Sequence, residues 1–271
     1  MKSLWSRLYR LYLFFTDKGA VTFEMVTRDM INDFIKYLAP YSTTYVSENL
    51  RMLRRLSLYA FQNGYHAEDL SGCVPSVKNS RQQRLPAVFS EDEVEKILSS
   101  FDRENPIDKR NYAIFLLAAR MGIRSCDIKA LEFSFINWTE KIISFTQKKT
   151  QKYLILPLPD DVGWAIIDYL KNGRPISDSK YIFIQHTPPY GQYSDLRNVL
   201  VKQMRKAGIE TPANKRIGMH CFRHSLATTM LENGVPLPVI SQTLGHADIS
   251  STEVYLRINI SQLRLCALEV E

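Results

Sequence analysis

The stretch HCFRHSLATTMLENGVPLPVISQTLGHADISSTEVY, residues 220–255, decides how the C-terminal part of the chain folds. The spacing of its apolar residues predicts one helix over about 220–233, a second over about 236–244 and a short helical piece at about 250–255. Polar and aromatic residues in this stretch therefore occupy defined helical positions. They are the first candidates for chemistry.

Four of these residues stand out. On a helix that begins near His220, positions 220 and 223 lie on one face, so His220 and Arg223 are expected to point together. Gly245-His246 follows the second helix, and Tyr255 comes nine positions after His246. Each residue alone also has an ordinary structural explanation, such as a helix cap, a core histidine or a half-buried aromatic ring.

Metal and nucleotide chemistry are not indicated. His220 and His224 are spaced i, i+4, but Cys221 stands where a zincin helix needs glutamate, and Arg223 on the same turn would repel a dication. The chain also contains no Gly-Lys dipeptide, so it has no Walker-type phosphate loop. We expect no metal site and no cofactor.

Upstream lies the only region with β-type patterning. Short runs at 135–138, 142–145 and 153–156 predict a three-stranded antiparallel meander, and Lys149 falls in the turn between the last two strands. The predicted fold class is therefore mainly α with a small antiparallel β-sheet (α+β). A lysine in a hairpin turn is most often simply solvated.

A nearly wholly apolar helix is predicted before the sheet, over about 111–121, and it should be buried. Gly122-Ile123-Arg124 follows it. Arg124 has a simple structural interpretation as an ion pair with Asp127.

The first part of the chain is predicted to be helical, with an opening helix that ends near Gly19 and further helices over about 27–38 and 43–62. The third of these helices carries Arg51, Arg54 and Arg55. They form either a solvated charged face or a basic face that follows DNA phosphates.

The periodicity fails from Ser71 to Pro86, and Ser90 with Glu93 then forms a capping box that starts a new helix. We predict a helical domain over 1–75, a basic linker over 76–86 and a mixed domain over 87–271, with an apolar tail from about 257. The linker cations could lie along a DNA backbone; they are Lys78, Arg81 and Arg84.

The composition modestly favours nucleic acid as a binding partner, because the chain has a formal net charge of +7 and a pI of about 9.1. The four cysteines include no CxxC pair, and the N-terminal segment is too short and too interrupted by arginine to span a bilayer. We expect a reduced, cytoplasmic protein associated with the nucleoid, with no membrane contact.

The ordered set of motifs resembles the phage-integrase or tyrosine-recombinase family. The matching elements are Met121-Gly122-Ile123-Arg124-Ser125-Cys126-Asp127, Lys149-Thr150, His220-Cys221-Phe222-Arg223-His224, Leu244-Gly245-His246 and Tyr255. The resemblance is strong over about 85–260 and looser before it.

The resemblance implies a transesterification at a DNA phosphodiester, with Tyr255 as the nucleophile that forms a 3′-phosphotyrosine. Arg124 and Arg223 would clamp the phosphate, because a guanidinium fork binds two oxygens and stays charged. Lys149 would protonate the leaving oxygen. His220 would act as a base or bind the phosphate, His246 would bind the phosphate, and Asp127 would orient Arg124 or a histidine.

The family also implies a partner, double-stranded DNA recombination sites, gripped by a helical core-binding domain and the catalytic domain. It implies a homotetramer in the synaptic complex and a monomer or dimer when free. The apolar tail could dock on a neighbouring protomer or on its own domain. The opening helix looks short for a full core-binding domain, so the first helix of that domain could be missing. Two alternatives stay open: a type IB topoisomerase, and a DNA-binding accessory protein that does not cut.

Overall fold

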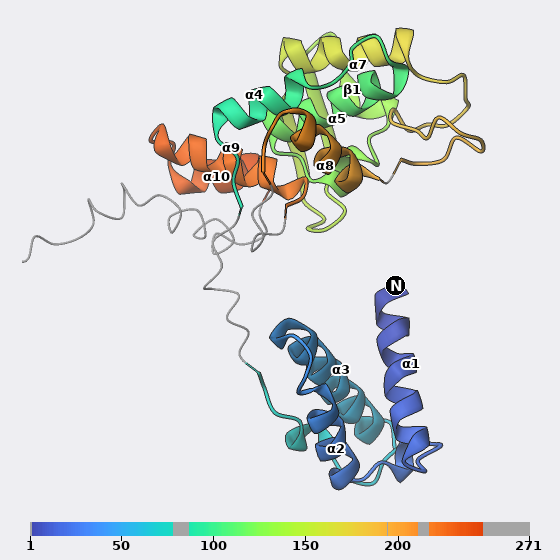
Figure 1. Cartoon of the computed structure of the whole chain (residues 1–271). Helices are drawn as coiled ribbons and strands as arrows, with labels where there is room; N and C mark the ends of the chain where they lie inside the picture. The colour runs from blue at the N-terminus through green and yellow to red at the C-terminus, as the bar shows by residue number, and fades with distance from the viewer. Residues whose placement is uncertain (1, 78–86, 194, 211–216, 246–271) are drawn as a thin grey trace, which may run out of the picture. The chain divides into compact units, whose positions relative to one another are not determined.

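The computed structural model describes residues 2–77, 87–193, 195–210 and 217–245. It divides the chain into two compact units, Met1–Arg84 and Leu85–Glu271, whereas the sequence predicted a linker over 76–86. We call them the helical unit and the mixed unit and describe each by itself (Figure 1). No helix among the described residues is both long and apolar enough to cross a membrane.

Three helices build the helical unit: α1 (Lys2–Asp17), α2 (Arg28–Leu38) and α3 (Thr43–Gln62). Their bounds agree with the predicted segments, because each break is coded locally. Thr27 and Ser42 accept backbone hydrogen bonds as N-caps of α2 and α3, while Gly19 takes a left-handed conformation just after α1. Short 3-10 turns at Phe23–Met25 and Leu70–Cys73 complete the unit.

The loss of helical periodicity suggested that the linker begins at Ser71. The structure shows instead that the segment from Ser71 to Val77 belongs to the helical unit. Leu70 and Val74 are buried in the core of the helical unit, and Val77 packs against that core. The guanidinium of Arg54 on α3 holds this segment, since its Nε and Nη2 donate to the carbonyl oxygen of Val74 at 3.2 and 2.7 Å. These residues are an integral part of the helical unit.

The mixed unit is assembled around α5. Its elements in order are α4 (Glu91–Ser99), α5 (Pro106–Met121), α6 (Ser125–Ile128), a 3-10 turn (Phe133–Phe135), β1 (Ile136–Asn137), β2 (Ile142–Thr146), β3 (Tyr153–Pro157), α7 (Asp160–Asn172), α8 (Leu196–Lys206), α9 (His220–Glu232) and α10 (Leu237–Leu244). The strands form an antiparallel sheet in the order β1-β2-β3, as predicted. The predicted capping box of Ser90 and Glu93 is present at α4. The fold is thus mainly helical with a small antiparallel sheet.

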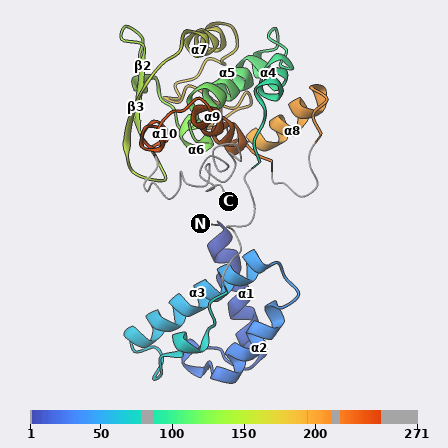
Figure 2. The same ribbon diagram turned by 90° about the vertical axis from the view of Figure 1, so that its left-hand side faces the viewer.

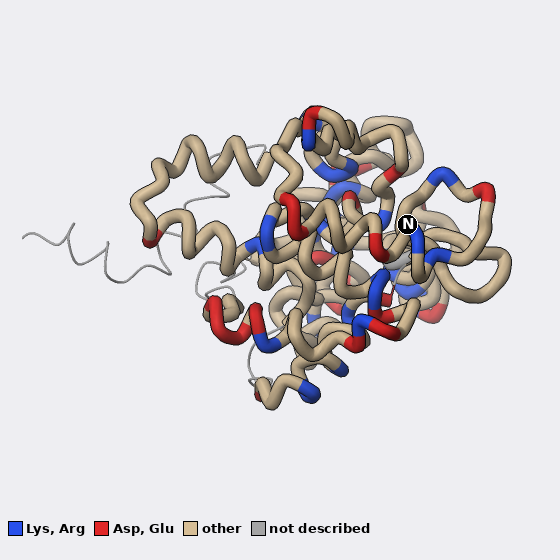
Figure 3. The backbone as a smooth tube through the Cα atoms, turned by 90° about the horizontal axis from the view of Figure 1, so that it is seen from above, with Lys and Arg blue, Asp and Glu red and all other residues tan. Residues whose placement is uncertain are grey.

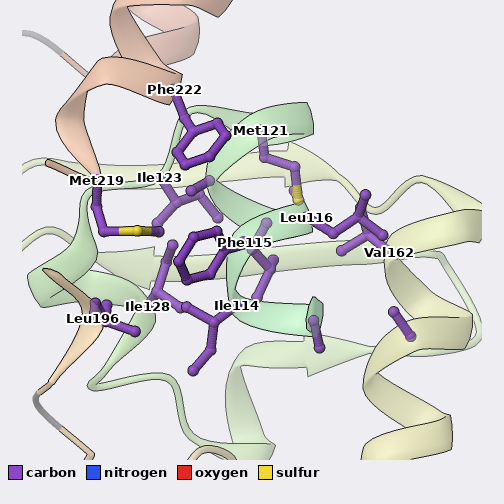
Figure 4. Packing of buried hydrophobic residues seen from close by; sticks show 14 of the residues in the cluster. Ile114, Phe115, Leu116, Met121, Ile123, Ile128, Val162, Leu196, Met219 and Phe222 are labelled. Carbon is purple, nitrogen blue, oxygen red and sulfur yellow. The ribbon is translucent and has the colours of Figure 1, made fainter. Parts of the chain in front are cut away.

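The core forms where α5 meets its neighbouring helices. Phe115 on α5 contacts the ring of Phe222 on α9 at a centroid distance of 5.6 Å, and both side chains are fully buried (Figure 4). Ile123, Ile128 and Met219 fill the space around these rings (Figure 4). This packing anchors α9 and the segment after α5 to one core, so the polar residues on both are held at fixed positions.

Helix α5 starts five residues before the predicted segment. Asn105 caps it and Pro106 occupies its first turn. The early turns carry charged residues that interrupt the apolar run, yet Arg110 is only 3% exposed. Its guanidinium donates to the carbonyl of Ile184 and lies over the ring of Tyr193. These tertiary contacts allow the charged side chain to be buried, and for this reason the apolar pattern alone predicted a helix that starts after Arg110.

Candidate active site

The arginine on α9 is a structural centre of the predicted site. Arg223 is 6% exposed; its Nη1 donates to the carbonyl of Gly122 at 2.8 Å and its Nη2 to the carbonyl of Leu244 at 2.6 Å. One guanidinium therefore joins α9, the segment after α5 and the C-terminal end of α10. These are three of the motifs that the sequence singled out.

Gly122 allows this close approach. It has a φ of +60°, and a Cβ at this position would lie 2.7 Å from Cδ2 of Leu244 and 3.1 Å from Cδ2 of Leu226. A side chain would therefore be strained and would collide with α9 and α10. The glycine keeps Arg124, two residues later, next to the end of α10.

Arg124 precedes the first residue of α6 and is half-buried. Its Nη2 lies 3.5 Å from the carbonyl oxygen of Gly245. Its Nη1 is buried and has no hydrogen-bond partner within the described residues. An unpaired buried donor costs about 1–3 kcal/mol, so this atom favours the binding of an anionic oxygen.

Asp127 was expected to orient Arg124 or a histidine, but its contacts lie elsewhere. Its Oδ1 accepts the backbone N–H of Lys148 at 2.9 Å and the thiol of Cys126 at 3.6 Å. No ion pair with Arg124 is found among the residues that the structure describes. Asp127 instead holds the β2–β3 turn, on which the predicted proton donor is carried.

Lys149 is exposed in that turn. Gln147 holds the turn in place; it is fully buried and was not among the residues predicted to be functional. Its Nε2 donates to the carbonyl of Leu244 at 3.1 Å, and its Oε1 accepts from the hydroxyl of Thr150 at 2.6 Å. Figure 2 shows the β2–β3 hairpin beside α10. The only sequence signal was a polar residue between a strand and a lysine turn, and this signal does not distinguish a buried anchor from a solvated one.

His220 is exposed at the start of α9, whereas Arg223 turns into the core. Partial burial of its imidazole lowers the pKa of His220 below 6.5. The ring of His224 lies 5.6 Å away, and burial with the nearby charges of His220 and Arg223 lowers the pKa of His224 to about 4. Both rings are thus neutral near pH 7, and the neutral imidazole of His220, which is only partly buried, can accept a proton.

Few negatively charged residues lie near Arg124 and Arg223 in the α9–α10 region. Between positions 220 and 245 the only charged residues are Arg223 and Glu232, and the α9–α10 hairpin is almost free of charge in Figure 3. Lys148 and Lys149 on the turn are both exposed beside it. The arrangement suits a multiply charged oxyanion such as a phosphodiester in its transition state.

Comparison with known proteins identifies the family to which the chain belongs. The family model "Phage integrase family" matches residues 87–262, and "Phage integrase SAM-like domain" matches residues 1–74. The chain belongs to the phage integrase family.

Relatives of this integrase-family chain include "Putative integrase/recombinase" y4rA and y4gC of Sinorhizobium fredii. Both are 36% identical to it, y4rA over 80% of this chain and y4gC over 69%. The chain spans about half of y4rA (52%) but 96% of y4gC. "Tyrosine recombinase XerD" of Listeria innocua is 30% identical over 86% of this chain and 79% of its own length.

Solved structures share the integrase fold. XerH site-specific recombinase bound to palindromic difH substrate matches with a TM-score of 0.74 and 18% identity, over 96% of this chain and 76% of that one. A lambda integrase dimer bound to a COC′ core site matches with a TM-score of 0.69 and 15% identity, over 93% and 86%.

Several predicted residues of this integrase-family chain lie outside the described residues: His246, Tyr255, Lys78, Arg81 and Arg84. The apolar tail from about 257 and the helical piece at 250–255 lie there too. Of the basic residues on α3, Arg51 and Arg55 are exposed, while Arg54 is engaged with Val74. The structure therefore brings together Arg124, Lys149 with its turn, and Arg223 around the end of α10.

Proposed function

We propose that this chain is a site-specific DNA recombinase that cuts and rejoins duplex DNA through a covalent 3′-phosphotyrosine at Tyr255. The observation that carries the proposal is the position of Arg223, whose fork joins the Arg124 segment to the carbonyl that lies two residues before His246. Membership of the phage integrase family supports it. In a mobile element, such a protein would act as an integrase or transposase.

In the proposed reaction the phenolic oxygen of Tyr255 attacks phosphorus, and the bond to the 5′-oxygen breaks. Arg124 and Arg223 stabilise the charge on the non-bridging oxygens, which is the largest contribution expected in such a site. The partly free fork of Arg124, with its unpaired Nη1, is suited to direct contact with a phosphate oxygen.

Two proton transfers accompany the attack. A free tyrosine has a pKa of about 10, so the phenol needs a base, and the neutral His220 is suited to accept its proton. Lys149 donates a proton to the departing 5′-oxygen. His246 binds the phosphate, and Asp127 supports the turn of Lys149. The covalent link conserves the bond energy, and the 5′-hydroxyl of a second strand then attacks it.

The proposed partner is a pair of DNA sites brought together in a homotetramer, with a monomer or dimer before synapsis. Arg51 and Arg55 on the helical unit, and the linker cations, would contact phosphates. This reaction takes place on nucleoid DNA in the cytoplasm.

The test is covalent capture on nicked suicide duplexes tiled across the DNA that flanks the gene. We expect a protein–DNA adduct on a defined site with the unmodified chain and none with Tyr255→Phe. An adduct that forms equally well with Tyr255→Phe would overturn the nucleophile. The absence of adducts on every duplex would support a non-cutting accessory protein, and relaxation of supercoils without a preferred site would support a topoisomerase.

A further inference from the structure

We infer that Gln147 is a positioning residue that sets the proton donor Lys149 against the end of α10. The inference rests on the proposed function, because it assigns a role within the same reaction. Gln147 directly follows β2, yet its side chain is fully buried among polar contacts.

The nitrogen and the oxygen of the Gln147 amide make hydrogen bonds to different parts of the structure. The Nε2 donor reaches the carbonyl of Leu244, and the Oε1 acceptor takes the hydroxyl of Thr150. The backbone of Gln147 also closes the turn, because its N–H donates to Lys152 and its carbonyl accepts from Gln151, both at 2.9 Å. One residue therefore fixes the turn internally and ties it to α10.

The contact with α10 has little freedom to shift. Gly245 follows Leu244 with a φ of +61°, and a Cβ there would lie 2.6 Å from both Nε2 and Oε1 of Gln147. The amide thus packs face to face against the backbone that leads to His246. Leu244 also accepts Nη2 of Arg223. The carbonyl of Leu244 is therefore shared by the phosphate clamp and the lysine turn.

A second, independent support fixes the other side of the turn, where Asp127 accepts the N–H of Lys148. Between these two anchors the side chain of Lys149 is exposed and makes no hydrogen bond or ion pair with the other described residues. A long, flexible ammonium can donate a proton efficiently only when its backbone is held in place. Loss of Gln147 should therefore misplace proton donation while the clamp arginines keep their own contacts.

Proton donation can be separated from the other steps by changing the leaving atom. In a duplex whose bridging 5′-oxygen is replaced by sulfur, the leaving group is a thiolate, which needs no proton because thiols ionise at about pH 8.5. We would measure single-turnover adduct formation on oxygen and sulfur substrates of the same sequence. Lys149→Ala provides the benchmark for complete loss of the donor.

For Gln147→Met, which keeps the volume and removes both hydrogen bonds, we expect adduct formation on the oxygen substrate to fall about 10- to 100-fold. On the sulfur substrate the rate should stay within about threefold of the unmodified chain, since no proton is required. The matched control is Gln203→Met. Gln203 is also fully buried and bonded to a hydroxyl, that of Ser100, but it lies on α8 outside the proposed site.

Equal impairment on both substrates, or no loss on the oxygen substrate, overturns the inference. If Gln147→Met does not fold, Thr150→Val decides, since it removes only the hydroxyl bonded to Oε1. If Thr150→Val forms the adduct more slowly on the oxygen substrate and at the normal rate on the sulfur substrate, the inference is supported. If its rate on the oxygen substrate is not selectively reduced, the inference is refuted. The unmodified chain on the sulfur substrate tests the proposed function separately. If it forms no Tyr255-dependent adduct there, the proposed function fails first.

Discussion

Arg223 donates to the carbonyl oxygen of Leu244 at 2.6 Å, across the 21 positions that separate α9 from the end of α10. The same guanidinium donates to Gly122. A residue expected to clamp a phosphate is therefore also a structural tie. Arg124, by contrast, makes one long contact at 3.5 Å. The two clamp arginines should respond differently to the same substitution.

We expect Arg223→Lys to destabilise the protein by about 2–4 kcal/mol, because one ammonium cannot reach both carbonyls and charged hydrogen bonds contribute about 1.5–3 kcal/mol each. Arg124→Lys should cost less than about 1 kcal/mol, since it gives up only one weak contact. Adduct formation should fall at least about 100-fold in both variants, as expected when a transition-state donor is lost. Urea unfolding and suicide-substrate capture measure the two effects. Equal stability of the two variants would contradict the structural role of Arg223.

Gly122 offers a second test of the same junction. Gly122→Ala should destabilise the protein by about 2–4 kcal/mol, because it adds left-handed strain to a collision with Leu244. The matched control is Gly234→Ala, which has a φ of +76° but nothing within 4 Å of the new Cβ. It should cost only about 1 kcal/mol of strain. Thermal unfolding compares the two, and similar losses would mean that the close packing at Gly122 contributes little.

The elements of the fold were largely predictable because their signals are local. The bounds of α3 were predicted to the residue, since a cap at one end and Asn63-Gly64 at the other both act within one turn. The meander followed from three β-type runs and their turns. Arg124, Lys149 and Arg223 could be selected because the ordered motifs that contain them resemble those of the phage-integrase family, whose reaction needs those residue types.

The supporting contacts could not be predicted, because they depend on residues distant in the chain. Gln147 and Leu244 are 97 positions apart, and nothing next to Gln147 marks it as buried. The family resemblance assigned Asp127 to orient Arg124 or a histidine, but its carboxylate accepts the N–H of Lys148 in the turn. Arg54 shares a helix face with other arginines, and only the fold brings Val74 to it.

The arginines of α3 give a prediction about DNA. Arg51→Ala and Arg55→Ala should each reduce the slope of log affinity against log salt by about 1, because each removes one phosphate contact. Arg54→Ala should instead lower the stability of the helical unit by about 1–3 kcal/mol, since it leaves the Val74 carbonyl without its donors. Binding titrations at several salt concentrations and urea unfolding separate the two effects. If Arg54→Ala changes the salt slope as much as the other two and leaves stability intact, its assigned role is wrong.

The pH dependence of cleavage distinguishes the two roles of His220. Burial lowers its pKa below 6.5, so the neutral ring that can accept a proton persists to a lower pH than for a solvated histidine. If His220 is the base, adduct formation should fall as the pH drops through this lowered pKa, and His220→Gln should reduce the rate and remove this acid limb. If a cationic His220 binds the phosphate instead, the rate should fall as the pH rises through the same pKa. His224→Gln is the matched control. The pKa of His224 is about 4, so this histidine stays neutral at any higher pH, and its replacement should not move the midpoint of the acid limb. A profile that is unchanged by His220→Gln would exclude both roles.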